Sequence, residues 1–140
     1  MYEVMFALHV LSAVAVGFYL LMPFLTMNIA GMPQDRLSGY TGPLAAMNRI
    51  GQFVLVITLV TGGAMLHDAP VSMAWGTVAV ILILIIFALS GMMSKPLRQL
   101  ASGDVRDAAG LSGKLRSLSI LNAVALLLIV LLMLNPEFLR

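Results

Sequence analysis

Four long apolar stretches alternate with polar segments along the chain, at residues 4–29, 48–66, 73–93 and 115–134. Each stretch reaches or approaches the length of about 20 residues that an α-helix needs to cross a bilayer. Lipid offers no partners to backbone polar groups, so a chain that crosses it has to be helical. The pattern therefore predicts an all-α protein, an integral membrane four-helix bundle, built as one domain over residues 1–140.

The residues that interrupt this pattern predict how the helices are joined. Pro23 lies inside the first stretch and is predicted to kink its helix about one turn earlier. Residues 31–43 contain three Gly and two Pro and are predicted to be irregular. The short connection at residues 67–72 makes the second and third helices antiparallel neighbours. The longest polar segment, residues 94–114, is expected to hold a short amphipathic helix on the membrane surface.

The composition supports a membrane protein and excludes several kinds of site. Hydrophobic residues make up 61% of the chain and charged residues only 10%, whereas charged residues make up about 25% of a soluble domain. The chain has no cysteine, so disulfides, thiolate metal sites and thiol catalysis are excluded. The formal net charge is +2. Its basic residues border the apolar stretches, so they predict orientation in a bilayer and no nucleic-acid partner.

The distribution of Lys and Arg predicts which way the bundle faces. Seven of the eight basic residues border the first and third connections: Arg36, Arg49, Lys95, Arg98, Arg106, Lys114 and Arg116. Loops rich in Lys and Arg stay in the cytoplasm, so both connections are expected there. We therefore expect both termini to be extracytoplasmic in a multi-pass protein of the cell inner (plasma) membrane.

Two histidines and two methionines form the candidate site. His9 is the one ionisable side chain within the first stretch, and a titratable group inside a membrane helix suggests function. The predicted topology brings His67 to the same extracytoplasmic end. Met5 lies one turn before His9, and Met65 lies close to His67. Imidazole and thioether groups suit haem iron or Cu(I), so we consider His9, His67, Met5 and Met65 as cofactor ligands, with the two histidines as the metal ligands.

The same residues also have ordinary structural interpretations. Methionine commonly fills gaps between apolar helices, and His67 beside Asp68 is a typical solvated side chain. A single histidine inside the membrane can also bond to a carbonyl or hydroxyl of a neighbouring helix. Both interpretations of His9 therefore stay open.

Small residues predict close contact between the first two helices. Ser12 and Ala13 follow His9, and Gly62 and Gly63 precede His67 at the matching depth. Small side chains allow two helix backbones to approach each other, or leave room for a flat ring. We expect these four residues to lie at the contact between the helices.

Residues 6–25, FALHVLSAVAVGFYLLMPFL, resemble the first helix of the cytochrome-b-like group of small membrane proteins. This group includes the CopD copper-resistance domain, the HemJ type of protoporphyrinogen oxidase and related uncharacterised four-helix proteins. The shared features are an LH motif near the outer start of the helix, here Leu8-His9, and a following Gly17. The resemblance implies a four-helix membrane bundle that holds haem b or a metal, with His9 as the matching residue.

Three functions follow from these observations. The first is haem b binding through His9, in electron transfer or haem handling, with His67 or a methionine as second ligand. The second is a Cu(I)-binding or copper-transfer module. The third is a cofactor-free subunit that stabilises a larger membrane complex, or a homo-oligomer. The sequence leaves open whether the protein is an enzyme.

Overall fold

The computed structural model describes residues 1–103 and 107–139, and all of its regular structure is helical. The elements in chain order are α1 Tyr2–Val16, the 3₁₀ turn η1 Gly17–Leu20, α2 Met22–Met27, α3 Gln34–Leu66, α4 Met73–Ala101 and α5 Ala108–Leu134. Together α1, η1 and α2 form the first of four segments that are long and apolar enough to cross a membrane. The protein is therefore an all-α, multi-pass membrane protein with a lipid bilayer around it.

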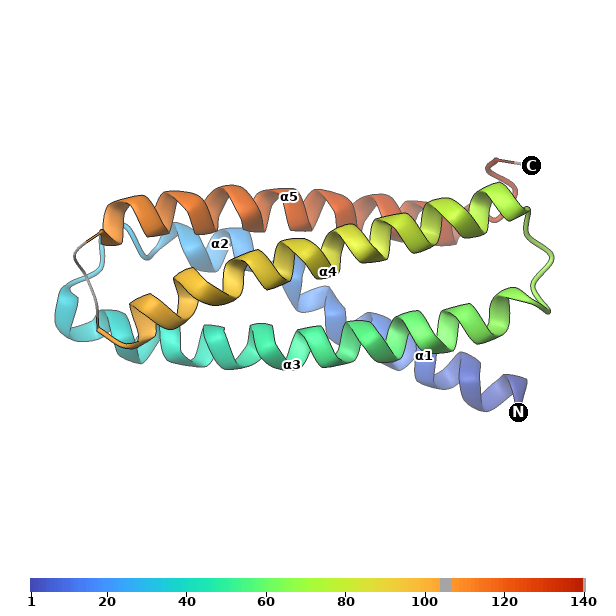
Figure 1. The fold of residues 1–140 in the computed structure, drawn as a ribbon, viewed down its shortest axis with the longest axis horizontal. Helices are drawn as coiled ribbons and strands as arrows, with labels where there is room; N and C mark the ends of the chain where they lie inside the picture. The colour runs from blue at the N-terminus through green and yellow to red at the C-terminus, as the bar shows by residue number, and fades with distance from the viewer. Residues whose placement is uncertain (104–106, 140) are drawn as a thin grey trace.

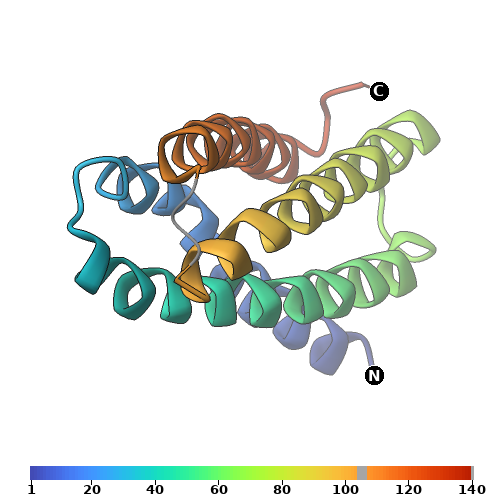
Figure 2. The same cartoon turned by 60° about the vertical axis from the view of Figure 1, so that its left-hand side comes forward.

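The four segments lie side by side along one long axis (Figures 1 and 2). Figure 1 shows both chain termini at the end where α3 joins α4, and we call this the terminal end (residues 1–5, 67–72 and 135–139). The opposite end is the basic end, where α2 joins α3 and α4 joins α5 (residues 28–36 and 95–116). The short connection between α3 and α4 makes them antiparallel neighbours, as predicted.

The first span is broken in its middle, which confirms the predicted kink. The α-helix ends at Val16, a 3₁₀ turn covers Gly17–Leu20, and α2 begins at Met22 with Pro23 in its first turn. Pro23 lacks the backbone N–H that would donate to Tyr19 four residues earlier, and at this position a 3₁₀ turn replaces the α-helix. The break lets one span reach two neighbours, because α1 packs on α3 while η1 and α2 pack on α5.

The helix of the second span is longer than the sequence predicts. Residues 31–43 were expected to be irregular, but α3 begins at Gln34 and continues through Pro43 to Leu66. Three residues at helical spacing, Leu37, Thr41 and Leu44, are buried on one face of this added segment. Their packing outweighs the loop preference of Gly and Pro, which is a weak local effect.

The expectation of a separate surface helix in residues 94–114 is also wrong. The helix α4 runs on to Ala101 with Pro96 buried inside it, and α5 already begins at Ala108. Leu97, Leu100 and Leu115 are 0% exposed, so the extended helix ends pack on the bundle. Asp104 and Arg106 belong to the expected segment but lie outside the described residues.

Candidate functional site

His9 lies at the contact between α1 and α3, in the half of the bundle nearer the terminal end. Its side chain is half-buried. The imidazole Nδ1 lies 3.0 Å from the carbonyl oxygen of Thr58 and 3.1 Å from Thr61 Oγ1. Thr61 has no distinctive signal in the sequence, because its role depends on the register between two helices.

The partners of Nδ1 determine which ring nitrogen carries the proton. A carbonyl oxygen only accepts, so Nδ1 has to donate to Thr58. The Thr61 hydroxyl donates to the Ile57 carbonyl at 2.7 Å, so it also accepts from Nδ1. A neutral His9 therefore carries its proton on Nδ1 and keeps a free lone pair on Nε2. Histidines that bind metals are commonly held in this way, with one ring N–H on a backbone carbonyl and the other nitrogen on the metal.

The α3 backbone approaches the His9 ring at Gly62. A Cβ atom at this position would lie 2.8 Å from His9 Cε1, which is closer than carbon atoms pack. Ser12 is buried in the same contact and accepts a hydrogen bond from Thr58 Oγ1 at 2.9 Å. The predicted close approach is therefore correct for Ser12 and Gly62.

The other two small residues predicted at this contact do not take part in it. Ala13 is exposed, and Gly63 is exposed with open space where a Cβ would be. Each of them follows a residue of the contact by one position, which turns it to another side of its helix. The prediction is wrong for Ala13 and Gly63.

Met5 and Met65 extend the α1–α3 contact by one turn toward the terminal end. Met5 precedes His9 by four residues, and Met65 follows Thr61 by four, so each lies on the contact face of its helix. Because α1 and α3 run antiparallel, both positions lie on the side of His9 nearer the terminal end. Both side chains are half-buried. The contact faces of the two helices therefore carry one imidazole and two thioether side chains in this half of the bundle.

His67 lies apart from this group. It follows the last residue of α3, and its side chain is 95% exposed. Its Nδ1 lies 3.8 Å from a carboxylate oxygen of Asp68, which is itself 74% exposed. The structure thus does not bring His67 into the contact that holds His9. Within the described residues, no three His, Cys, Asp or Glu side chains gather to hold a metal ion.

A second polar cluster, which the sequence analysis did not identify, joins three spans nearer the basic end. Tyr19 is 0% exposed, and its hydroxyl donates to the carbonyl and the Oδ1 of Asn48 at 3.2 and 3.1 Å. Asn48 Nδ2 donates to the Ser90 carbonyl and to Ser94 Oγ. Gln52 Nε2 also donates to Ser94 Oγ, at 2.8 Å. Every polar atom of the Asn48 side chain is satisfied, which is typical of a structural contact between membrane helices.

Comparison with known proteins adds no family to this picture. The chain matches no protein-family model, and no curated protein or solved structure is significantly similar to it. The function has to be argued from the geometry of the chain itself.

Proposed function

We propose that this membrane protein binds Cu(I) through His9, Met5 and Met65 at the α1–α3 contact. The observation that carries the proposal is the hydrogen bond from His9 Nδ1 to the Thr58 carbonyl, which leaves the Nε2 lone pair free, while Met5 lies one helical turn away on the same face of α1. Imidazole and thioether are soft ligands, and Cu(I) is the ion that prefers them.

Haem b fits these residues less well than Cu(I). A pair of histidine ligands would need His67, whose side chain is 95% exposed beyond the end of α3. A His9–Met65 pair would need α1 and α3 to separate, because Gly62 already packs against the His9 ring. A single copper ion needs only the short reach of three side chains. We therefore derive no haem chemistry from this contact.

We further propose that the terminal end faces the extracytoplasmic side. The basic end carries every described Lys and Arg residue except Arg49, which lies within α3, and cytoplasmic loops are enriched in these residues. The copper site would then lie within about two helical turns of the outer membrane surface. A role in accepting or passing on Cu(I) from outside the cytoplasm is consistent with this position.

A competition titration tests the proposal. The purified protein is titrated with Cu(I) in the presence of a chromogenic Cu(I) chelator, and bound copper is counted by elemental analysis. We expect one copper per chain and a colourless protein without a Soret band. His9→Ala should abolish binding, and Met5→Leu or Met65→Leu should each weaken it about tenfold or more, because each removes one ligand.

Control variants at exposed residues of the same types distinguish copper ligands from residues that do not bind copper. His67→Ala and Met73→Leu change the same residue types at exposed positions, and both should leave copper affinity unchanged. Full copper retention by His9→Ala would contradict the proposal. A wild-type protein that binds neither copper nor haem would leave His9 as a packing residue and favour a cofactor-free subunit of a larger membrane complex.

A further inference from the structure

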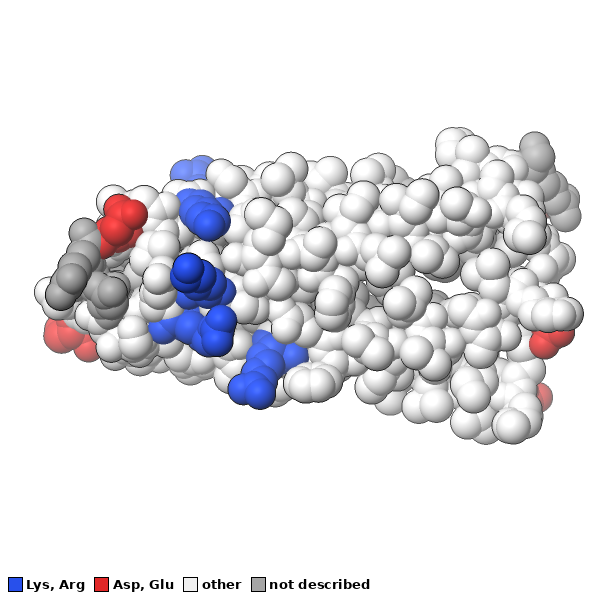
Figure 3. Space-filling view, viewed as in Figure 1, with Lys and Arg blue, Asp and Glu red and all other residues white. Residues whose placement is uncertain are grey.

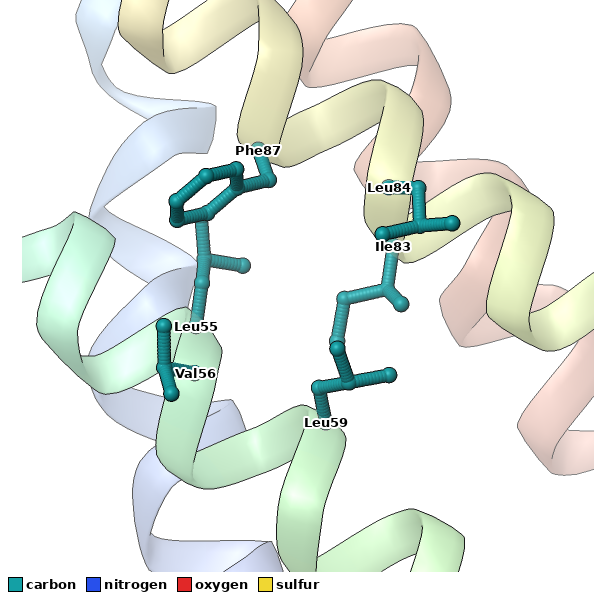
Figure 4. Close-up of a pocket in the computed structure, with 6 residues that line it drawn as sticks. All are labelled: Leu55, Val56, Leu59, Ile83, Leu84 and Phe87. Atoms are coloured by element: carbon teal, nitrogen blue, oxygen red, sulfur yellow. The ribbon is translucent and has the colours of Figure 1, made fainter.

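An apolar groove lies on the seam between α3 and α4, outside the contacts described so far. Figure 4 shows its lining, three residues from each helix, and its volume is about 110 Å³. The lining consists of Leu55, Val56, Leu59, Ile83, Leu84 and Phe87. No polar atom lines the groove, so its occupant has to be hydrocarbon.

Two basic residues lie on the same seam, further toward the basic end than the groove. On α3, Arg49 precedes Val56 by seven residues, which is two helical turns, so both lie on the same face. On α4, Lys95 follows Phe87 by eight residues and shares its face in the same way. Gly91 lies midway between Phe87 and Lys95, is exposed, and would have open space around a Cβ. The surface of α4 between Lys95 and the groove therefore carries no side chain at Gly91, while on α3 Gln52 lies between Arg49 and Val56 and donates to Ser94 Oγ at 2.8 Å.

Arg49 and Lys95 are available to a ligand. Both are exposed, and neither forms an ion pair or hydrogen bond with another described residue. Their sequence neighbours hold the two helices together, since Asn48 Nδ2 lies 3.1 Å from Ser94 Oγ. The two cations therefore flank one fixed helix contact. Figure 3 shows that Lys and Arg side chains gather in a band on this face, with a long uncharged surface on the side of the terminal end.

The groove lies at the membrane depth of the acyl chains of a lipid whose headgroup is level with Arg49. Leu55 and Leu59 follow Arg49 by six and ten residues, which places them about 9–15 Å further along the axis. The headgroup layer of one leaflet is only about 5–8 Å thick. With Arg49 at the headgroups, the groove lies in the hydrocarbon region beneath them.

We propose that the α3–α4 seam binds one anionic glycerophospholipid of the leaflet at the basic end. Its phosphate lies between Arg49 and Lys95, and one acyl chain follows Gly91 into the groove. Arginine and lysine both bind phosphate, arginine through a planar fork and lysine as a point charge. A zwitterionic lipid presents a positive group beside its phosphate and is held less tightly by the same pair.

Native mass spectrometry on the delipidated protein in detergent tests this site. The chain is titrated with phosphatidylglycerol or phosphatidylcholine of the same acyl composition, and bound lipid is counted. The double variant Arg49→Gln/Lys95→Gln should bind phosphatidylglycerol about 30-fold more weakly, since each basic residue near a charged membrane contributes about fivefold. Gly91→Leu, which fills the open space at that position without a clash, should also weaken binding.

The matched control removes the same charge elsewhere at the basic end. Arg36→Gln/Lys114→Gln should lower affinity less than threefold, and glycerol 3-phosphate, which has no acyl chain, should not compete. Thermal unfolding midpoints of all variants should stay near that of the wild type, because none of these side chains has a described partner. Equal binding of the two lipids, equal losses in both double variants, or full competition by glycerol 3-phosphate would each overturn the proposal.

Discussion

Two buried asparagines, Asn48 on α3 and Asn122 on α5, differ sharply in their surroundings. Both are almost fully buried, at 1% and 0% exposure. Asn48 donates twice to α4 and accepts from Tyr19, so that its amide joins three spans. Neither amide atom of Asn122 has a hydrogen-bond partner within the described residues.

The difference shows that the groups offered by the neighbouring spans decide whether a buried amide is satisfied in this bundle. Ser119, one turn from Asn122, donates to the carbonyl of Arg116 in its own helix and contacts Thr26 Oγ1 at 3.1 Å. A serine or threonine hydroxyl lies close to the backbone, so it can donate to a carbonyl three or four residues earlier in its own helix. The longer amide of Asn122 points away from its helix and depends on what the neighbouring spans offer.

The same substitution at the two asparagines should have opposite effects, and the larger one is expected at Asn48. Asn48→Leu keeps the size of the side chain but removes both hydrogen bonds from Nδ2 to α4, and it leaves the Tyr19 hydroxyl only the backbone carbonyl of residue 48 as acceptor. Interhelical hydrogen bonds in membranes contribute about 0.6–1.7 kcal/mol each, so we expect a loss of about 2–4 kcal/mol. Thermal unfolding in detergent measures this change. An unaltered midpoint would show that the cluster contributes nothing to stability.

Hydropathy alone predicted the four spans, because the requirement for about 20 apolar residues is local and strong. It failed at the basic end, where α3 starts at Gln34 although Gly and Pro favour a loop. There the helix is stabilised by the burial of Leu37 and Leu44, a tertiary contact that no local pattern contains. Helix positions inside the bilayer are thus predictable, while helix ends outside it are not.

In the half of the bundle nearer the terminal end, the contact between His9 and Gly62 allows a similar test of stability. Gly62→Leu places side-chain atoms where the His9 ring lies, so the ring has to move away from Thr58. Overpacking of this kind typically costs about 1–3 kcal/mol. Gly63→Leu is the matched control, since a side chain there meets open space. Similar unfolding midpoints for the two variants would contradict the close contact between α1 and α3.

The candidate site was predictable only in part. His9 was identified because an ionisable group in an apolar helix is rare, and Met5 because it lies one turn away on the same helix. His67 was grouped with His9 by depth in the membrane, which says nothing about the direction of a side chain at a helix end. The partners of Asn48 were missed for a related reason. They depend on the register between α3 and α4, which the sequence pattern does not give.

The smallest expected effect, and the only gain in stability, is at Asn122. Its neighbours Leu118, Ala125 and Leu126 are buried and apolar, so the amide loses its hydration without compensation. Asn122→Leu removes that cost at nearly constant volume and should raise stability by about 1 kcal/mol, read from the same unfolding experiment as Asn48→Leu. Asn122→Ala separates polarity from packing, because it removes the amide but leaves a cavity and should be less stable than Asn122→Leu. A loss of stability in Asn122→Leu would mean that the amide has a partner after all, such as an internal water, and the contrast with Asn48 would disappear.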